Sequence, residues 1–172
     1  MTAITARGRP RWTLFGAIAL IVAVADQLSK AWLVGAIEPG GSVQVIGDFV
    51  RLTFVRNSGA LFGLFRDSAP LFGLVSIAVV GAIAWYHGSA GRNTLMSIAL
   101  GLLLGGAIGN LIDRLRLGYV VDFVDLGIGS LRFYTFNVAD SAITCALLLL
   151  IATAFLPIGR AGRDGGEPVA HG

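Results

Sequence analysis

The chain has 172 residues, of which 55% are hydrophobic and only 13% are charged, and its mean hydropathy is +0.79. A water-soluble domain of this length does not need so many apolar residues, so the composition indicates an integral membrane protein. The formal net charge is +3, but the basic residues are arginines scattered at the ends of apolar runs. This pattern argues against a nucleic-acid partner and is typical of residues that mark membrane sidedness.

Cysteine and histidine offer no sign of a disulfide or a metal site. Cys145 is the single cysteine, so an internal disulfide is excluded, and its apolar surroundings predict a small hydrophobic residue. The two histidines, His87 and His171, lie far apart with no cluster of cysteines or acids around either. We predict no metal and no cofactor.

Four apolar runs, at residues 13–37, 70–86, 94–112 and 138–156, are candidates for membrane-spanning helices. Pro70 suits a first helical turn, and Pro157 with Gly159 ends the last run. The fold class predicted is an all-α membrane protein with four transmembrane helices in a single domain over residues 1–158. The polar, glycine-rich tail at 159–172 is expected to be disordered and cytoplasmic.

The first run admits a second interpretation, because three arginines precede a short apolar stretch that ends in Ala23-Val24-Ala25. This arrangement imitates a cleavable signal peptide. Against that interpretation, the apolar run resumes beyond Lys30. In addition, Asp26 and Lys30 are four residues apart, so on a helix they face the same way and can form an ion pair.

The segments at residues 42–66 and 118–136 are rich in β-branched and aromatic residues. The first contains a Gly47-Asp48 turn, and the second contains a turn at residues 127–130 between two strand-like stretches. With four spans, both segments fall on the same side of the membrane. We therefore expect a small extramembrane β-sheet platform there.

The count of basic residues does not decide which side is cytoplasmic, because six arginines fall on each side of the predicted spans. The N-terminal tail decides it instead, since Arg7, Arg9 and Arg11 precede the first span without an intervening acid. We predict that both termini are cytoplasmic and that the β segments lie outside.

Polar residues gather at the ends of the spans on the sheet side. In the third span, Gly106, Asn110 and Arg114 share one ridge of a helix, and a second ridge carries Gly101, Gly105, Gly109 and Asp113. Small residues let a neighbouring helix approach closely, which places the polar residues at the mouth of the contact. Such residues near membrane depth are functional candidates.

Two acids could form a hydrolytic pair. Asp122 lies within the apolar stretch VVDFV, and Asp140 opens the fourth span on the same side of the membrane. Two carboxylates in one low-dielectric pocket acquire different pKa values, so that one can hold a proton while the other accepts one from water. We therefore predict an aspartyl dyad of Asp122 and Asp140.

Structural interpretations compete with each candidate. Asn137 and Asp140 have the spacing of a helix cap, and Asp122 could be a solvent-facing acid of an edge strand. Asp113 with Arg114 could be a surface pair at the end of a helix, and Asn57 could be a turn residue beside Gly59. For Asp26 with Lys30, a structural ion pair within the membrane is favoured over a catalytic role.

Five short strings in order along nearly the whole chain resemble the lipoprotein signal peptidase (signal peptidase II) family. None is specific alone, but their order and spacing on four spans match that family. Leu61 departs from it, because an alanine often follows Gly-Ala there, and we expect only a local packing difference. The strings are DQLSK at 26–30, RNSGALFG at 56–63, GNLIDRL at 109–115, GYVVDFVD at 118–125 and FNVADS at 136–141.

The resemblance implies an intramembrane aspartyl endopeptidase of the bacterial cytoplasmic membrane whose catalytic aspartates are Asp122 and Asp140. Its substrate would be a diacylglyceryl-modified prolipoprotein, cut just before the lipid-modified cysteine, and its other partner would be membrane lipid. We expect a monomer. The same resemblance implies that the substrate or the dyad is positioned by Asn57, Asn110, Arg114 and Asn137, with Asp26 and Lys30 as structural support.

Two other classes of function are considered. A small transporter or channel subunit would use Asp26, Lys30, Asp113 and Arg114 as a polar path across the bilayer, and it predicts polar residues through the whole membrane depth. A membrane scaffold would assemble partners through the glycine ridges and would make the aspartates dispensable. Neither class requires two acids paired across a loop.

Overall fold

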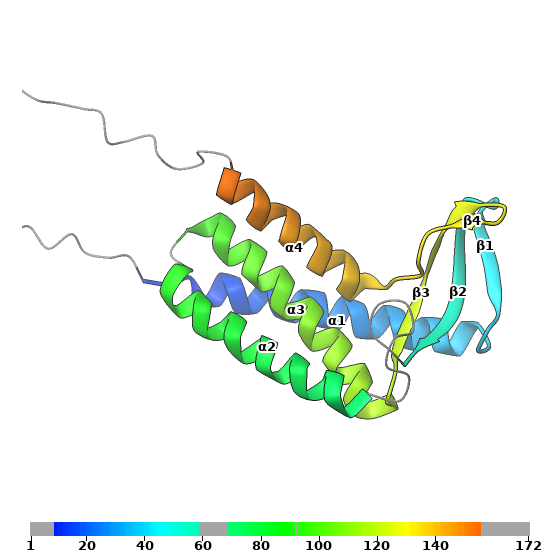
Figure 1. Cartoon of the computed structure of the whole chain (residues 1–172), viewed down its shortest axis with the longest axis horizontal. Helices are drawn as coiled ribbons and strands as arrows, with labels where there is room; N and C mark the ends of the chain where they lie inside the picture. The colour runs from blue at the N-terminus through cyan, green and yellow to red at the C-terminus, as the bar shows by residue number, and fades with distance from the viewer. Residues whose placement is uncertain (1–8, 59–68, 92, 156–172) are drawn as a thin grey trace, which may run out of the picture.

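A computed structural model of the chain describes residues 9–58, 69–91 and 93–155. Four helices run lengthwise through the molecule, and one small sheet lies across one end of them (Figure 1). The described chain enters and leaves the bundle at the end away from the sheet. The helices are α1 (Trp12–Ala36), α2 (Ala69–Ala90), α3 (Thr94–Leu117) and α4 (Val138–Phe155).

Helix α3 is the centre of the bundle, because it packs against α1, α2 and α4. Its start is capped by Asn93, whose side chain accepts a hydrogen bond from the backbone N–H of Leu95 at 2.8 Å. Its end is set by Gly118, which adopts a left-handed conformation with φ of 77° that favours glycine. The bounds of this helix are therefore encoded locally.

The glycine ridges predicted on the third span face two different helices. A Cβ on Gly105 would lie 2.7 Å from the carbonyl oxygen of Ala19, so this ridge packs on α1. A Cβ on Gly106 would lie 2.5 Å from the carbonyl oxygen of Ala139, so the other ridge packs on α4. Both contacts are too close for a larger side chain, which explains why glycine occupies these positions.

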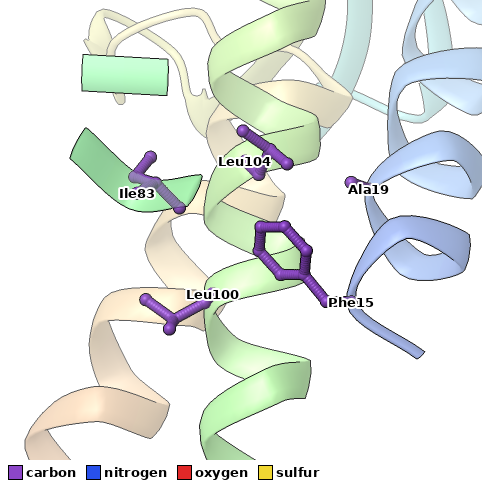
Figure 2. Close-up of a cluster of buried hydrophobic side chains, with 5 residues drawn as sticks. All are labelled: Phe15, Ala19, Ile83, Leu100 and Leu104. Carbon is purple, nitrogen blue, oxygen red and sulfur yellow. The ribbon is translucent and has the colours of Figure 1, made fainter. Parts of the chain in front are cut away.

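An apolar cluster fills the bundle on the side away from the sheet. Figure 2 shows side chains from α1, α2 and α3 pointing toward one another in this cluster. Its members are Phe15, Ala19, Ile83, Leu100 and Leu104, each at most 8% exposed.

The sheet is antiparallel throughout and has the strand order β1-β2-β3-β4. Its strands are β1 (Ser42–Ile46), β2 (Val50–Asn57), β3 (Val120–Ile128) and β4 (Leu131–Arg132). A second apolar cluster, formed by Leu33, Ile37, Phe54, Val121 and Phe123, joins the sheet to the end of α1. The sheet is therefore anchored to the bundle rather than suspended on loops.

The elements agree with the sequence predictions in kind and differ in detail. Among the described residues, α1, α3 and α4 are long and apolar enough to cross a membrane, while α2 has a shorter apolar stretch from Gly73 to Ser89. The two β segments form one sheet, but the strand-like stretch after the second turn is mostly not regular strand. Strand β4 has only two residues, and the turn is confined to residues 129–130. The predicted tail at 159–172, Leu61 and Gly59 lie outside the described residues.

Candidate active site

Buried polar side chains come together where the sheet meets the bundle. They come from α1, α3, β3 and the start of α4, which are far apart in sequence. Each is at most 8% exposed, so each needs a partner within the protein. They are Asp26, Lys30, Asn110, Asp113, Asp122 and Asn137.

Asp122 lies in the interior of the sheet on β3, opposite Val55 of β2. Its carboxylate accepts two hydrogen bonds, from Asn57 Nδ2 at 2.9 Å and from Asn137 Nδ2 at 2.7 Å. The side chain is only 2% exposed. The interpretation of Asp122 as a solvent-facing acid of an edge strand was therefore wrong, because β2 covers one side of β3 and Phe136 pairs with Val124 on the other.

Asp140 lies in the first turn of α4 and takes part in a reciprocal cap with Asn137. The backbone N–H of Asp140 donates to Asn137 Oδ1 at 2.9 Å, and the backbone N–H of Asn137 donates to Asp140 Oδ2 at 3.1 Å. The capping interpretation is thus confirmed. Capping leaves the other oxygen of Asp140 available, and it accepts from Asn110 Nδ2 at 2.8 Å.

Asn137 is the group that joins the two carboxylates. Its side-chain amide binds Asp122, and its backbone N–H binds Asp140, as described above. The same Nδ2 atom also lies 3.1 Å from Asn110 Oδ1. The fully buried Asn137 therefore binds Asp122 of the sheet and Asp140 of α4 at the same time.

The environment of Asp122 alters its protonation. Burial, and to a lesser extent the nearby charge of Asp140, raises the pKa of Asp122, and the net value is about 6. The hydrogen bonds from Asn57 and Asn137 and the positive charge of Lys30 oppose this rise. Near neutral pH the side chain can therefore exchange a proton, which an exposed aspartate with its ordinary pKa of 3.8 cannot do efficiently.

A buried ion triad, formed by Asp26, Lys30 and Asp113, lies beneath the two carboxylates. Lys30 Nζ is 2.8 Å from Asp26 Oδ2 and 2.9 Å from Asp113 Oδ2, and the three side chains are at most 4% exposed. The predicted intramembrane ion pair of Asp26 and Lys30 is confirmed. The alternative interpretation of Asp113 and Arg114 as a surface pair was wrong for Asp113, which is buried and binds Lys30 of α1.

The ion triad also holds the backbone next to each carboxylate. Asp113 Oδ2 accepts from the backbone N–H of Val121 at 3.0 Å, and Val121 directly precedes Asp122. Asp26 Oδ1 accepts from the backbone N–H of Ala139 at 2.9 Å, and Ala139 directly precedes Asp140. The triad therefore links the two segments that carry the carboxylates through a single lysine.

Gln27 and Asp113 belong to the site but were not among the residues predicted for it. Gln27 Nε2 lies 2.9 Å from Asp113 Oδ1 and 3.2 Å from both Asp26 Oδ2 and the carbonyl oxygen of Gly109. The glycine ridge offered a signal for Asp113, since it continues the row that faces α1. Gln27 had no comparable signal, because a polar residue beside Asp26 can equally face a headgroup.

The remaining predicted residues lie around the same centre. Lys30 Nζ also donates to Asn110 Oδ1 at 3.1 Å, so Asn110 connects the ion triad to Asp140. Arg114 Nη1 lies 3.3 Å from the carbonyl oxygen of Asn110, and its charge acts on Asp140, Asp122 and Asp113. Within the described part of the chain, no three His, Cys, Asp or Glu side chains are grouped as metal ligands.

Comparisons with known proteins agree on one family. The family model described as signal peptidase (SPase) II matches residues 18–156. A lipoprotein signal peptidase from Moorella thermoacetica is 43% identical over 148 residues, covering 86% of this chain and 96% of that protein. Another from Caulobacter vibrioides is 42% identical over 156 residues, covering 86% and 89% respectively. A solved bacterial membrane enzyme superposes with a TM-score of 0.80 at 31% identity, covering 94% of this chain and 98% of that one.

Proposed function

The chain belongs to the signal peptidase II family. We therefore propose that it is an aspartic endopeptidase that removes signal peptides from prolipoproteins. Its substrate carries a diacylglyceryl group on the cysteine that follows the scissile bond. We propose that Asp122 and Asp140 are the catalytic pair. The observation that carries this assignment is the bridge by Asn137, which binds both carboxylates in a largely buried site.

The reaction needs one protonated and one ionised carboxyl group at its start. Asp122 suits the protonated role, because burial raises its pKa to about 6. Asp140 suits the ionised role, because it lies in the first turn of α4, where the helix dipole favours a negative charge.

In the proposed mechanism, Asp140 removes a proton from a water molecule whose oxygen attacks the peptide carbonyl carbon. Asp122 donates a hydrogen bond to the carbonyl oxygen and so stabilises the negative charge that develops there. The proton taken up by Asp140 then passes to the leaving nitrogen as the carbon–nitrogen bond breaks. The products are the carboxyl end of the signal peptide and the free amino group of the lipid-modified cysteine.

The other polar residues position these groups. Asn57 and Asn137 hold Asp122, while Asn110 and Asn137 hold Asp140. Arg114 supplies a positive charge to the side of the site where Asp140 lies, and in this role it stabilises the ionised base. Asp26 and Lys30 support the site from below, as members of the ion triad.

The location of the site suits a lipid-anchored substrate. A diacylglyceryl cysteine holds its scissile bond at the membrane surface. The two carboxylates belong to β3 and to the first turn of α4, and these elements meet where the sheet joins the bundle (Figure 1). We propose that all four helices cross the bacterial cytoplasmic membrane, with both termini in the cytoplasm and the sheet outside. The N-terminal arginines support this orientation. The protein is proposed to act as a monomer.

A processing assay in detergent micelles tests the proposal. The wild-type protein should shorten a diacylglyceryl-modified precursor and leave the unlipidated precursor uncut. Asp122→Asn and Asp140→Asn should each lower the cleavage rate by at least about 10²-fold while the protein stays folded, because each removes one proton-transferring group. Cleavage at the wild-type rate by either variant would rule out the pair.

Asp125→Asn is the matched control. Asp125 is a buried carboxylate on the same strand, but its side chain binds Arg132 rather than the asparagines of the site. This variant should cleave the lipidated precursor at close to the wild-type rate. A loss as large as that of Asp122→Asn would show that the strand tolerates no neutralised acid, and would remove the support for a specific role of Asp122.

A transporter or channel is not favoured. Such a function needs polar groups along the bundle, whereas the apolar cluster fills the described core beyond the ion triad (Figure 2). His87 and Ser97 are buried beyond that cluster, but they bind each other at 3.1 Å and so form a local contact. A scaffold function would leave the paired carboxylates without a role.

A further inference from the structure

The end of the sheet exposes large apolar side chains that the proposed chemistry does not use. They lie in two adjacent turns, the β1–β2 turn at 46–49 and the β3–β4 turn with its flanks at 128–133, which together we call the sheet tip. Leu131 is 84% exposed, Ile128 is 71% exposed and Phe133 is 67% exposed. Ile46 and Phe49 in the other turn are more than half exposed. Side chains of this size rarely gather on a surface that faces water.

The charged groups of the sheet tip bind one another. Arg132 Nε lies 2.6 Å from Asp125 Oδ1, and Arg132 Nη1 donates to the carbonyl oxygen of Asp48 at 3.0 Å. Asp48 also forms an ion pair with Arg51 and accepts from the backbone N–H of Gly129. These two acids and two bases cancel in charge. The surface that the sheet tip presents outward therefore consists mainly of its apolar side chains.

These polar contacts also make the tip a defined unit. The backbone N–H of Gly127 donates to the carbonyl oxygen of Phe49 at 3.0 Å, which joins the two turns directly. Between them lies a shallow groove of about 420 Å³ lined by Phe49, Leu126, Gly127, Leu131, Arg132 and Phe133. An open groove lined by aromatic and aliphatic groups suits acyl chains or the apolar part of a lipid headgroup region.

A short segment of chain connects the sheet tip to the start of α4. Figure 1 shows the tip projecting sideways past the start of α4, at the opposite end of the sheet from the turn that follows α1. Only five residues separate β4 from α4. The outer side of α4 exposes Leu147, Leu148 and Ile151, so it faces lipid if the helix crosses the membrane. The tip is therefore connected to the start of a helix whose outer side is apolar.

We propose that the sheet tip inserts its apolar side chains into the interfacial layer of the bilayer beside α4. Large apolar side chains such as those of Phe49 and Phe133 are typical of surfaces that enter this layer, and pairing lowers the cost of bringing the charges of the tip near it. Because the tip and Asp122 share strand β3, insertion holds the sheet at a fixed height over the membrane. The proposal concerns a lipid contact and does not depend on which residues perform the chemistry.

Depth-dependent quenching tests this contact in the full chain. In a Cys145→Ala background, Leu131→Cys is labelled with an environment-sensitive fluorophore, and the protein is reconstituted into phosphatidylethanolamine–phosphatidylglycerol liposomes. Some liposomes contain lipid brominated near the headgroup. Ser42→Cys is the matched control, because Ser42 is exposed at the other end of β1. Brominated lipid should lower emission at position 131 at least about twofold more than emission at position 42.

Two results would overturn the proposal. If iodide in the aqueous phase quenches both labels equally and brominated lipid quenches neither, the sheet tip lies in water. If the label at position 131 is shielded from both quenchers, another protein surface covers the tip, either a second copy of this chain or the substrate. Cleavage of the lipidated precursor by each labelled protein shows that it is folded.

A second variant keeps the test independent of the labelled position. The label is moved to Ser130→Cys, in the same turn, and is compared with and without the additional changes Leu131→Gln and Phe133→Gln. Removing these apolar groups should abolish quenching by brominated lipid and restore quenching by iodide. If lipid quenching is unchanged in the polar variant, the apolar side chains at positions 131 and 133 do not hold the sheet tip at the bilayer.

Discussion

At the end of the bundle away from the sheet, the apolar cluster fills the space between three helices. At the sheet end, the ion triad and the amide and carboxylate groups around it fill the corresponding space. Both ends use the same glycine-lined helix α3. At the first end, Gly105 lies against the backbone of α1, and at the second, Gly109 lies against Asp26. The backbones approach closely in both places, but different groups occupy the space.

This difference identifies which end of the molecule is shaped by function. Apolar packing suffices to hold helices together in lipid, where small residues allow close contact. Buried charges are costly there unless each is paired, and replacing them by apolar groups is often neutral or stabilising. Their presence at the sheet end therefore indicates that they serve the carboxylates above them rather than the stability of the bundle alone.

Replacing Lys30 should cause the largest loss of stability at the sheet end of the bundle. In Lys30→Met, Asp26 and Asp113 remain buried without their shared cation, so the free energy of unfolding should fall by about 3–5 kcal/mol. Cleavage of the lipidated precursor should be lost as well, since the triad holds the backbone beside Asp122 and Asp140. Unfolding of the purified protein in micelles measures the first effect.

The triple variant Lys30→Met, Asp26→Asn, Asp113→Asn separates charge from packing. It removes the two unpaired charges and should recover much of the lost stability without recovering full cleavage. If Lys30→Met alone is as stable as the wild type, the lysine does not hold the two acids, and the contrast between the two ends of the bundle loses its basis.

The stability of the polar end should depend on pH through Asp122. Its pKa is about 6 in the folded protein and about 3.8 when unfolded, so the folded state binds the proton more tightly. As the pH rises from below 4 to above 6, the unfolded chain releases this proton first. The free energy of unfolding should therefore fall by about 3 kcal/mol over that range. Asp122→Asn should remove this dependence.

The cleavage rate should fall on the alkaline side near pH 6, where Asp122 loses its proton in the free enzyme. Asn57→Ala removes a hydrogen bond that lowers the pKa of Asp122, so this fall should move to higher pH by about one unit or less. Thr53→Ala, on the same strand but beside Asp125, should leave the profile in place. A shift of the Asn57→Ala profile to lower pH would contradict the proposed proton on Asp122.

A change at the apolar end should affect stability and not the chemistry. Leu104→Ala leaves a cavity in the apolar cluster (Figure 2) and should lower the free energy of unfolding by about 2 kcal/mol. The kcat and KM for the lipidated precursor should stay near the wild-type values below the unfolding temperature. A selective loss of kcat in this variant would show that the two ends are coupled.

The elements of the fold were predictable because hydrophobic runs, turn residues and caps act locally. The existence of α1, α3 and α4 follows from apolar runs, and the end of α3 follows from Gly118. The length of the fourth strand was not predictable, since residues 133–135 have strand-like side chains. The regular ladder stops after Arg132, and the chain pairs with β3 again only at Phe136, directly before α4.

The sequence also predicted that Asp122 and Asp140 lie near each other, since each is an acid beside apolar residues at the same end of the predicted spans. Their resemblance to a known family supplied the proposed roles. Gln27 and the true partner of Asp113 could not be found, because both depend on how α1 and α3 rotate about their own axes. Local spacing does not determine that rotation.

By itself, the sequence determined that this is a membrane protein with helical spans, a β segment on one side and isolated acids near the ends of the spans. Those features depend on residues that are close together in the sequence and on the free-energy cost of polar groups in lipid. Only the tertiary structure decided that Asn137 joins Asp122 to Asp140, and that Lys30 lies between Asp26 and Asp113. The reason is that the contacts of Asn137 with Asp122 and of Lys30 with Asp113 join separate segments of the chain, and only the packing of α1, α3, α4 and the sheet brings them within bonding distance.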